Sequence, residues 1–331
     1  MRSFRAILAA AAAVAAAGVT FMAVPAKAAQ DSSYPDHAIR IVVPYEAGGG
    51  TDVIARIFAA QLSTQTKQTV VVENHGGAGG IVGASAVAHA SPDGYTVLFT
   101  PQGPITIAPN FKRPLSYNPK TDLVPVAMVA EQPIVFAVNA KSPWSDFKSF
   151  VAAAKKAPGA LNFGSPGVGT EMDLTVDLLQ QKTGIEMVHL PFKGGGPAIN
   201  ALLRGDIAMM PVVPSSILPH VKGGNVKLLG TTARNRLAAF PDVPTTKELG
   251  VPDVDIRPWW GLFVPKGTPP DVVARLQAAT DAVSKDKDYR GRMSKISTDV
   301  AFVPSNEFAD MLAKQTARWG TVIQTSHIEL K

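Results

Sequence analysis

Cysteine is absent from the 331 residues of this chain. Its absence excludes a disulfide framework, a cysteine nucleophile, a thiolate zinc site and an iron–sulfur cluster. Charged residues are also sparse, at 18% of the chain, whereas hydrophobic residues make up 46%. This balance is typical of a globular fold and excludes disordered, collagen-like and coiled-coil chains. The length is sufficient for two domains with well-buried cores.

Signatures of several common enzyme and cofactor sites are also missing. The dinucleotide pattern GxGxxG fails after Gly167 and Gly169 because Met172 occupies the third glycine position. The nucleophile pattern GxSxG fails at Ser165, since Phe163 takes the place of the first glycine. The six histidines are scattered and lack the spacing of metal ligands. We therefore expect no metal and no cofactor, although a triad assembled from distant residues is left open.

The N-terminus has the pattern of a secretory signal peptide. Arg2 and Arg5 precede an uncharged, alanine-rich stretch, and Ala26-Lys27-Ala28 is a small-x-small cleavage site. We predict a cleaved signal at residues 1–28 and export of the mature chain; a membrane anchor is disfavoured because alanine is only weakly hydrophobic. Cleavage removes three positive charges and lowers the formal net charge from +6 to +3. Such a small and scattered charge does not indicate nucleic-acid binding.

The chain repeats a strand, a glycine-rich loop and a helix. Ile39–Val43 predicts a strand, Gly48-Gly49-Gly50 a tight loop, and the helical spacing of apolar residues from Thr51 to Leu62 a helix. Repeated units of this kind indicate parallel sheets with helices on their faces, which is an α/β fold. The series is interrupted near residues 130 and 255. We therefore predict two lobes, one made of residues 29–129 and 255–331 and the other of residues 130–254.

Glycine-rich loops stand between a predicted strand and a predicted helix at Gly48–Asp52, Gly76–Gly80, Gly164–Thr170 and Gly194–Pro197. Glycine lets the backbone approach a ligand closely. A helix N-terminus presents free N–H groups and a partial positive charge. In open α/β sheets such loops meet beyond the carboxyl ends of the strands. Each loop is therefore a candidate anion site, and the alternative is that the glycines only form tight turns.

The same loops carry motifs that resemble a known family. The stretches Val43–Asp52, Val71–Gly80, Ala90–Thr96, His189–Ala198 and Pro241–Thr245 resemble, in this order, the signatures of the Bug family. These proteins are periplasmic solute receptors of tripartite tricarboxylate transporters. The resemblance implies a type II periplasmic binding fold, a Venus flytrap of two α/β lobes with a ligand cleft between them. It also implies a receptor without enzymatic activity that binds a small carboxylate and meets the membrane subunits of the transporter. We expect a monomer.

The resemblance implies that the ligand carboxylate lies between the loops Tyr45–Asp52 and Ser165–Thr170. The predicted ligand-binding residues are Tyr45, Ala47, Gly48, Gly49, Asp52, Ser165, Gly169, Thr170, Lys193 and Gly194. Asp52, Ser165 and Thr170 also fit a role as helix caps. The resemblance implies a di- or tricarboxylate or an aromatic carboxylic acid as the ligand, and all of these are compatible with the sequence. The alternative function is a secreted hydrolase or lyase that acts on a small carboxylate in the same cleft.

Two positions depart from the family pattern. Asp173 stands where the family often has histidine, and Met210-Pro211 stands where an aromatic–Asp pair is usual. The missing Asp removes a partner for a ligand ammonium, which slightly favours a plain carboxylate over an amino acid. Trp259 and Trp260 fit core packing or, at a cleft mouth, contact with an aromatic ligand.

Overall fold

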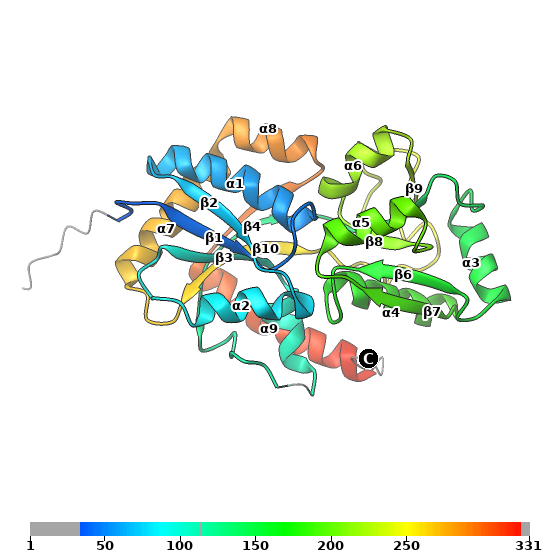
Figure 1. Cartoon of the computed structure of the whole chain (residues 1–331), viewed down its shortest axis with the longest axis horizontal. Helices are drawn as coiled ribbons and strands as arrows, with labels where there is room; N and C mark the ends of the chain where they lie inside the picture. The colour runs from blue at the N-terminus through cyan, green and yellow to red at the C-terminus, as the bar shows by residue number, and fades with distance from the viewer. Residues whose placement is uncertain (1–33, 113, 326–331) are drawn as a thin grey trace, which may run out of the picture. The chain divides into compact units, whose positions relative to one another are not determined.

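The computed structural model describes residues 34–112 and 114–325, so the predicted signal peptide lies outside the described residues. The larger sheet has six strands in the order β11-β4-β10-β3-β1-β2 (Figure 1). β1 pairs in parallel with β2 and β3, whereas β10 runs antiparallel to β3 and β4. The strands are β1 (Ile39–Val43), β2 (Val70–Asn74), β3 (Thr96–Pro101), β4 (Leu123–Glu131), β10 (Trp259–Pro265) and β11 (Asp299–Pro304).

The middle of the chain forms two smaller sheets. β5 (Val135–Asn139) lies between β8 (Met210–Val212) and β9 (Val226–Thr231), and β6 (Leu161–Ser165) pairs in parallel with β7 (Met187–Pro191). An isolated bridge between Phe163 and Met209 joins these sheets. We call the elements around the six-stranded sheet lobe 1 and those around the smaller sheets lobe 2. The sequence boundaries predicted for the lobes stay a prediction.

Helices cover both faces of the six-stranded sheet (Figure 1). The helices α1 (Gly50–Thr66), α7 (Pro270–Lys285) and α8 (Lys287–Lys295) share a core with one face, and α2 (Ile81–Ala88) and α9 (Ser305–Thr325) share a core with the other. Along β1, Ile39, Ile41 and Val43 point to the first core and Val42 to the second. Because β1 is covered on both faces, nearly its whole length is apolar.

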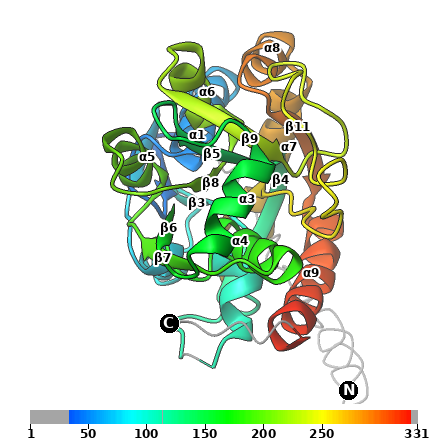
Figure 2. The same ribbon diagram turned by 90° about the vertical axis from the view of Figure 1, so that its right-hand side faces the viewer.

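Lobe 2 has the same layered build. The helices α3 (Phe147–Lys156) and α4 (Glu171–Thr183) pack on one face of its sheets, and α5 (Gly195–Arg204) and α6 (Pro214–Lys222) pack on the other (Figure 2). On β5, Phe136 and Val138 join the core with α3 and α4, while Val135 and Ala137 join the core with α5 and α6. Alternation along a single buried strand therefore separates the two cores of this lobe.

Strands that pass between the lobes make the sheets mixed, and the parallel pairing expected from the repeated units is found in β1 with β2 and β3 and in β6 with β7. β4 enters lobe 2 and β10 returns from it, so β10 runs against its neighbours. Buried Gln132 lies at this crossing, where its N–H donates to the Pro258 carbonyl at 2.9 Å. Its side-chain amide donates to the Ile296 carbonyl and accepts from Ser215 Oγ, each at 2.9 Å. Gln132 thus bonds to both lobes.

The segment between β3 and β4 contains short helical turns. These are η2 (Gly103–Ile107) and η3 (Ala108–Asn110), and a further turn, η1 (Ala78–Gly80), precedes α2. η2 is buried throughout and packs against α9. Among the described residues, no helix has the length and apolar character needed to cross a membrane.

Candidate functional site

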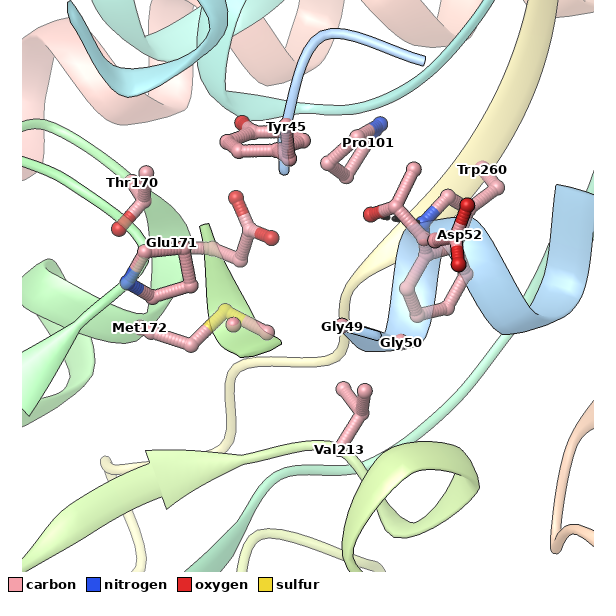
Figure 3. A pocket seen from close by; sticks show the side chains of 13 residues that line it. Tyr45, Gly49, Gly50, Asp52, Pro101, Thr170, Glu171, Met172, Val213 and Trp260 are labelled. Carbon is pink, nitrogen blue, oxygen red and sulfur yellow. Dashed lines mark hydrogen bonds between the residues drawn. The ribbon is translucent and has the colours of Figure 1, made fainter. Parts of the chain in front are cut away.

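A small pocket lies where the N-terminal ends of several helices meet between lobe 1 and lobe 2 (Figure 3). Lobe 1 contributes the start of α1, and lobe 2 contributes the starts of α4 and α5 and the residue before α6. The cavity measures about 30 Å³. Its lining residues are Tyr45, Gly49, Gly50, Thr51, Asp52, Pro101, Pro166, Thr170, Glu171, Met172, Gly195, Val213 and Trp260. None of these lining residues is basic, so the groups that could attract an anion here are the backbone N–H groups at the helix starts.

The start of α1 presents uncovered backbone to the pocket. Its N-cap is Gly49, and no side chain caps this end of the helix. The first N–H groups of a helix have no partner within the helix, so they are available to a bound anion. Gly48 has φ of +85°, a left-handed conformation that glycine adopts without strain. The turn therefore brings bare backbone up to the cavity.

Asp52 fixes this turn from inside α1. Its carboxylate accepts from the Gly48 N–H at 3.0 Å and from Asn74 Nδ2 at 3.0 Å, and Arg56 Nη2 lies 2.9 Å away. Burial alone raises the pKa of Asp52, but the hydrogen bonds from Arg56, Gly48 and Asn74 outweigh it and hold the pKa below its ordinary value. Asp52 is thus an ionised residue whose charge is already balanced by Arg56.

Two aromatic side chains wall the pocket from lobe 1. Tyr45 is buried, and its hydroxyl donates to the Gly79 carbonyl at 3.1 Å. Trp260 is also buried, and its Nε1 donates to Thr51 Oγ1 at 3.0 Å. Both polar groups therefore have partners inside the protein. Both members of the Trp259-Trp260 pair pack in a core, Trp259 on the α2 and α9 side of the sheet and Trp260 on the α1 side, and Trp260 also lines the pocket.

On lobe 2, side chains bond the loop before α4 to itself. Thr170 is the N-cap of α4, where its Oγ1 accepts from the Asp173 N–H and donates to the Gly167 carbonyl at 2.8 Å. Ser165 Oγ lies 3.0 Å from the Gly167 carbonyl and 2.7 Å from His189 Nε2. Asp173 completes the set, with Oδ1 3.1 Å from His189 Nδ1 and Oδ2 accepting from the Gly169 N–H at 2.9 Å.

Ser165, His189 and Asp173 thus have the contacts of a serine-protease triad. Burial lowers the pKa of His189 to about 4, so its imidazole is neutral. Burial and then the charge of Asp177 raise the pKa of Asp173 to about 7, against the effect of the Gly169 N–H. Because these shifts disfavour a charged pair, we interpret the contact as a hydrogen bond from Nδ1 of neutral His189. Ser165 is fully buried and does not line the pocket, so the arrangement orders the loop.

Glycine backbones bring the two lobes into direct contact beside the pocket. The Glu46 N–H donates to the Lys193 carbonyl at 3.0 Å. A Cβ on Gly196 would lie 2.1 Å from the Ala47 carbonyl oxygen, and a Cβ on Gly49 would lie 3.1 Å from Gly195 Cα. Only glycine permits this approach, so the structure holds the lobes in a closed arrangement.

Glu171 is the main feature that the sequence did not reveal. Its side chain is 2% exposed and points into the pocket from the first residue of α4 (Figure 3). Burial raises the pKa of Glu171 to about 7, although the backbone N–H groups of Glu171 and Gly103 act in the opposite direction. Oε2 makes no hydrogen bond within the described part of the chain. The only signal in the sequence is that Glu171 directly follows Thr170, a candidate helix cap. An acidic residue at this position also fits ordinary stabilisation of the helix dipole.

Some of the predicted site residues line the cavity, and the others lie next to it without lining it. Tyr45, Gly49, Asp52 and Thr170 line the pocket. Outside the lining set are Ala47, Gly48, Gly169, Lys193 and Gly194 on the adjoining loops and Ser165 at the end of β6. The Lys193 side chain is exposed. Val213 lines the pocket from the start of a helix that the sequence pattern did not predict. No cluster suited to a metal ion occurs among the described residues.

A model of the tripartite tricarboxylate transporter family receptor matches residues 54–328. The chain belongs to this family. It is similar to the periplasmic binding protein BugD, at 30% identity and a TM-score of 0.86 over 89% of this chain and 99% of that one. It is also similar to two structures from Rhodopseudomonas palustris. One, solved with adipate, has 27% identity and a TM-score of 0.86, covering 89% of this chain and 99% of that one. The other, MatC with bound malate, has 31% identity and a TM-score of 0.82, covering 88% and 100%.

Membership in this family decides between the functions that the sequence left open. The family consists of solute-binding receptors, so the prediction that the chain is not an enzyme is confirmed and a hydrolase or lyase is not retained. The predicted periplasmic binding protein fold is confirmed as well, with α/β lobes built on mixed sheets. In a receptor, the triad-like contacts of Ser165 need no catalytic role.

Proposed function

We propose that this chain is a periplasmic receptor that holds a small carboxylate in the pocket between the lobes and delivers it to the membrane subunits of a tripartite tricarboxylate transporter. The observation that carries the proposal is the convergence of the starts of α1, α4 and α5 on a pocket without a basic side chain. Each helix start contributes roughly half a positive charge and free N–H donors. The adipate and malate in the two R. palustris structures support a carboxylate.

The proposed contacts fall into two groups. Tyr45, Gly49, Asp52 and Thr170 line the cavity and are proposed to form its walls and to present their backbone to the ligand. A second group is proposed to hold those backbones in place from the adjoining loops: Ala47, Gly48, Ser165, Gly169, Lys193 and Gly194. The proposal thus assigns recognition of the carboxylate mainly to backbone N–H groups, which stabilise an anion without a buried counter-charge.

Ligand capture is proposed to require movement of the lobes. A cavity of about 30 Å³ has space for roughly two water molecules, less than any dicarboxylate needs. We propose that the lobes, 29–129 with 255–331 and 130–254, separate about their crossing segments and close again around the ligand. Gln132 lies at this hinge and bonds to both lobes.

A screen for ligands tests the function. Thermal unfolding of the mature chain is followed with a set of aliphatic di- and tricarboxylic and aromatic carboxylic acids, each beside its neutral amide. Because a ligand that binds only the folded state raises the midpoint by mass action, we expect at least one acid, and not its amide, to raise it. Calorimetric titration then measures the affinity. If every acid leaves the midpoint unchanged while neutral compounds raise it, the proposal is wrong.

The remaining expectations have their own measurements. Export with cleavage before residue 29 is tested by the intact mass of protein recovered from the periplasm, and retention of Met1 would contradict it. Light scattering of the purified chain with and without the acid found in the screen tests the proposed monomer.

A further inference from the structure

Glu171 is a buried carboxyl with one oxygen, Oε2, that the described residues leave without a hydrogen-bond partner. Its side chain is 2% exposed, and its Oε2 makes no hydrogen bond among the described residues. Figure 3 shows the carboxyl pointing toward the middle of the cavity, opposite the start of α1. An unpartnered polar atom in such a position costs free energy unless a ligand satisfies it. Glu171 therefore has the placement of a ligand contact.

The charged and titratable groups around Glu171 do not balance its charge. From lobe 1, Tyr45 donates its hydroxyl proton to Gly79, and Asp52 is paired with Arg56. Tyr117, behind Tyr45, donates to the Pro104 carbonyl. The groups on lobe 2 are Asp173, which contacts His189, and Asp177, one helical turn further along α4. None of these groups is a cation that faces the Glu171 carboxyl.

We propose that Glu171 contacts the ligand as a protonated carboxyl that donates a hydrogen bond to a ligand carboxylate, so that capture of the acid takes up one proton from solvent. This inference rests on the proposed carboxylate-binding function. Two carboxylates in contact inside a buried pocket are not both ionised, because their repulsion is poorly screened there. One shared proton removes the repulsion and gives Oε2 or its neighbour a donor role. The ligand class is an anionic acid without an ammonium group.

The sign of the pH dependence follows from this contact. Burial gives Glu171 a pKa of about 7 in the closed arrangement without a ligand, and a bound anion raises it further. Above pH 7 the free protein has to acquire a proton on binding, so the affinity falls as the pH rises, by up to about tenfold per pH unit. Below pH 7 the free protein is already protonated and the affinity levels off. An amino-acid ligand would give the opposite sign, because its ammonium favours ionised Glu171.

Calorimetric titration with malate, adipate and aspartate tests the inference on the mature chain. Each titration is run at pH 6, 7 and 8, at each pH in two buffers that contain no phosphate or carboxylate and whose ionisation enthalpies differ, so that protons taken up can be counted. For malate or adipate we expect uptake approaching one proton at pH 8 and an affinity about fivefold lower than at pH 7. In Glu171→Gln, whose amide keeps a donor, we expect the pH dependence to disappear and the pH 8 affinity to exceed that of the wild type.

Glu186→Gln is the matched control, because Glu186 is an exposed residue of the same lobe outside the pocket. It should keep the pH dependence and the proton count of the wild type. The proton count on the wild type needs no variant, so it decides the question even if Glu171→Gln fails to fold. An acid that binds with no proton uptake and equal affinity at pH 7 and 8 overturns the inference and leaves the proposed receptor function intact. Aspartate binding with proton release also overturns it. Absence of binding by every acid in the wider screen overturns the receptor function itself.

Discussion

The two loops that face each other across the pocket are built in opposite ways. In lobe 1, the loop 45–52 approaches the cavity as bare glycine backbone, and α1 starts without a side-chain cap. In lobe 2, Thr170 caps α4, and Ser165, Asp173 and His189 bond the loop 165–170 to itself. The first loop leaves its N–H groups available, whereas the second uses its hydroxyl groups internally.

This difference changes what each lobe offers a ligand. Lobe 1 has backbone N–H groups free to donate hydrogen bonds to a ligand, because the Asp52 carboxylate bonds the Gly48 N–H, stabilises the turn and pairs its charge with Arg56. Lobe 2 offers a carboxyl at Glu171 and the first N–H groups of α4 and α5. Hydroxyl contacts to the ligand from Ser165 and Thr170, which the family resemblance suggests, compete with bonds that these residues already make.

The largest expected effect comes from blocking the contact between the loops. Gly196→Ala adds a Cβ that would lie 2.1 Å from the Ala47 carbonyl oxygen, and neither backbone can move without separating the lobes. Gly196 is helical, so alanine itself is tolerated in α5. We expect the variant to fold with unchanged stability and to lose affinity at least about a hundredfold, measured by calorimetric titration.

Gly291→Ala is the control for that change. Gly291 is also helical, in α8, and has open space where the new Cβ would lie. Its affinity should equal that of the wild type. If Gly196→Ala binds as tightly as Gly291→Ala, closure through this contact is not needed for binding.

The next largest effect is expected in the pH dependence of stability, which reports on the hydrogen bonds inside the lobe 2 loop. The pKa of His189 is lowered to about 4 in the folded chain, below the ordinary value of 6.5. The unfolded chain therefore binds a proton first as the pH falls, and stability from the neutral imidazole is lost between about pH 6.5 and pH 4. We expect His189→Gln to be less stable than the wild type at pH 7.5, and the gap to narrow by on the order of 2 kcal/mol at pH 4.5.

Urea unfolding at the two pH values measures that gap. Glu171 and Asp173 have raised pKa values, and their contribution to stability is lost as the pH rises instead. Both residues are present in both proteins, so the difference between the proteins reports on His189 together with its contact to Asp173. A gap that stays constant from pH 7.5 to pH 4.5 would show that the imidazole is not held neutral by the fold.

The contrast between the loops also shows what a sequence can reveal of this molecule. Gly48-Gly49-Gly50 stands between an apolar β-branched strand and an amphipathic helix, a local pattern that predicts both the turn and its exposed N–H groups. The layered α/β lobes follow from the same local alternation. The mixed sheets do not, because β10 pairs with β3 and β4 only after the chain has returned from lobe 2.

The hydrogen-bond partners of the lobe 2 residues could not be predicted from the sequence for a related reason. His189 lies 24 residues after Ser165. No local spacing indicates that the pairing of β6 with β7 places Ser165 Oγ 2.7 Å from His189 Nε2. α6 was missed because it begins with Pro214 and contains Pro219, which read as signs of a loop. Glu171 was missed because its burial depends on Tyr45 and Gly103, from the other lobe.

A smaller effect is expected at the cap of α4. Thr170→Ala removes the acceptor for the Asp173 N–H and the donor to the Gly167 carbonyl, which should cost about 1 kcal/mol of stability. Because this hydroxyl is already bonded to Gly167, we expect the affinity to fall less than about tenfold. Thr170→Ser keeps the hydroxyl and should match the wild type in both measurements. A much larger loss of affinity in Thr170→Ala, without loss of stability, would mean that the hydroxyl turns to the ligand.

The smallest effect is expected at Lys193, although a lysine beside an anion pocket could be expected to bind the anion directly. Its side chain is exposed and outside the cavity lining, and its contribution to the closed arrangement is the carbonyl that accepts from the Glu46 N–H at 3.0 Å. Lys193→Ala keeps that carbonyl. An exposed charge is screened over about 8 Å at physiological ionic strength, so we expect calorimetric affinity to change less than about twofold there. At low salt the association rate should fall modestly, because a positive charge near the entrance attracts anions. A loss of affinity above tenfold at physiological salt would contradict this assignment. It would mean that the Lys193 ammonium reaches the ligand, so that lobe 2 binds the anion with a charged side chain as well as with backbone N–H groups.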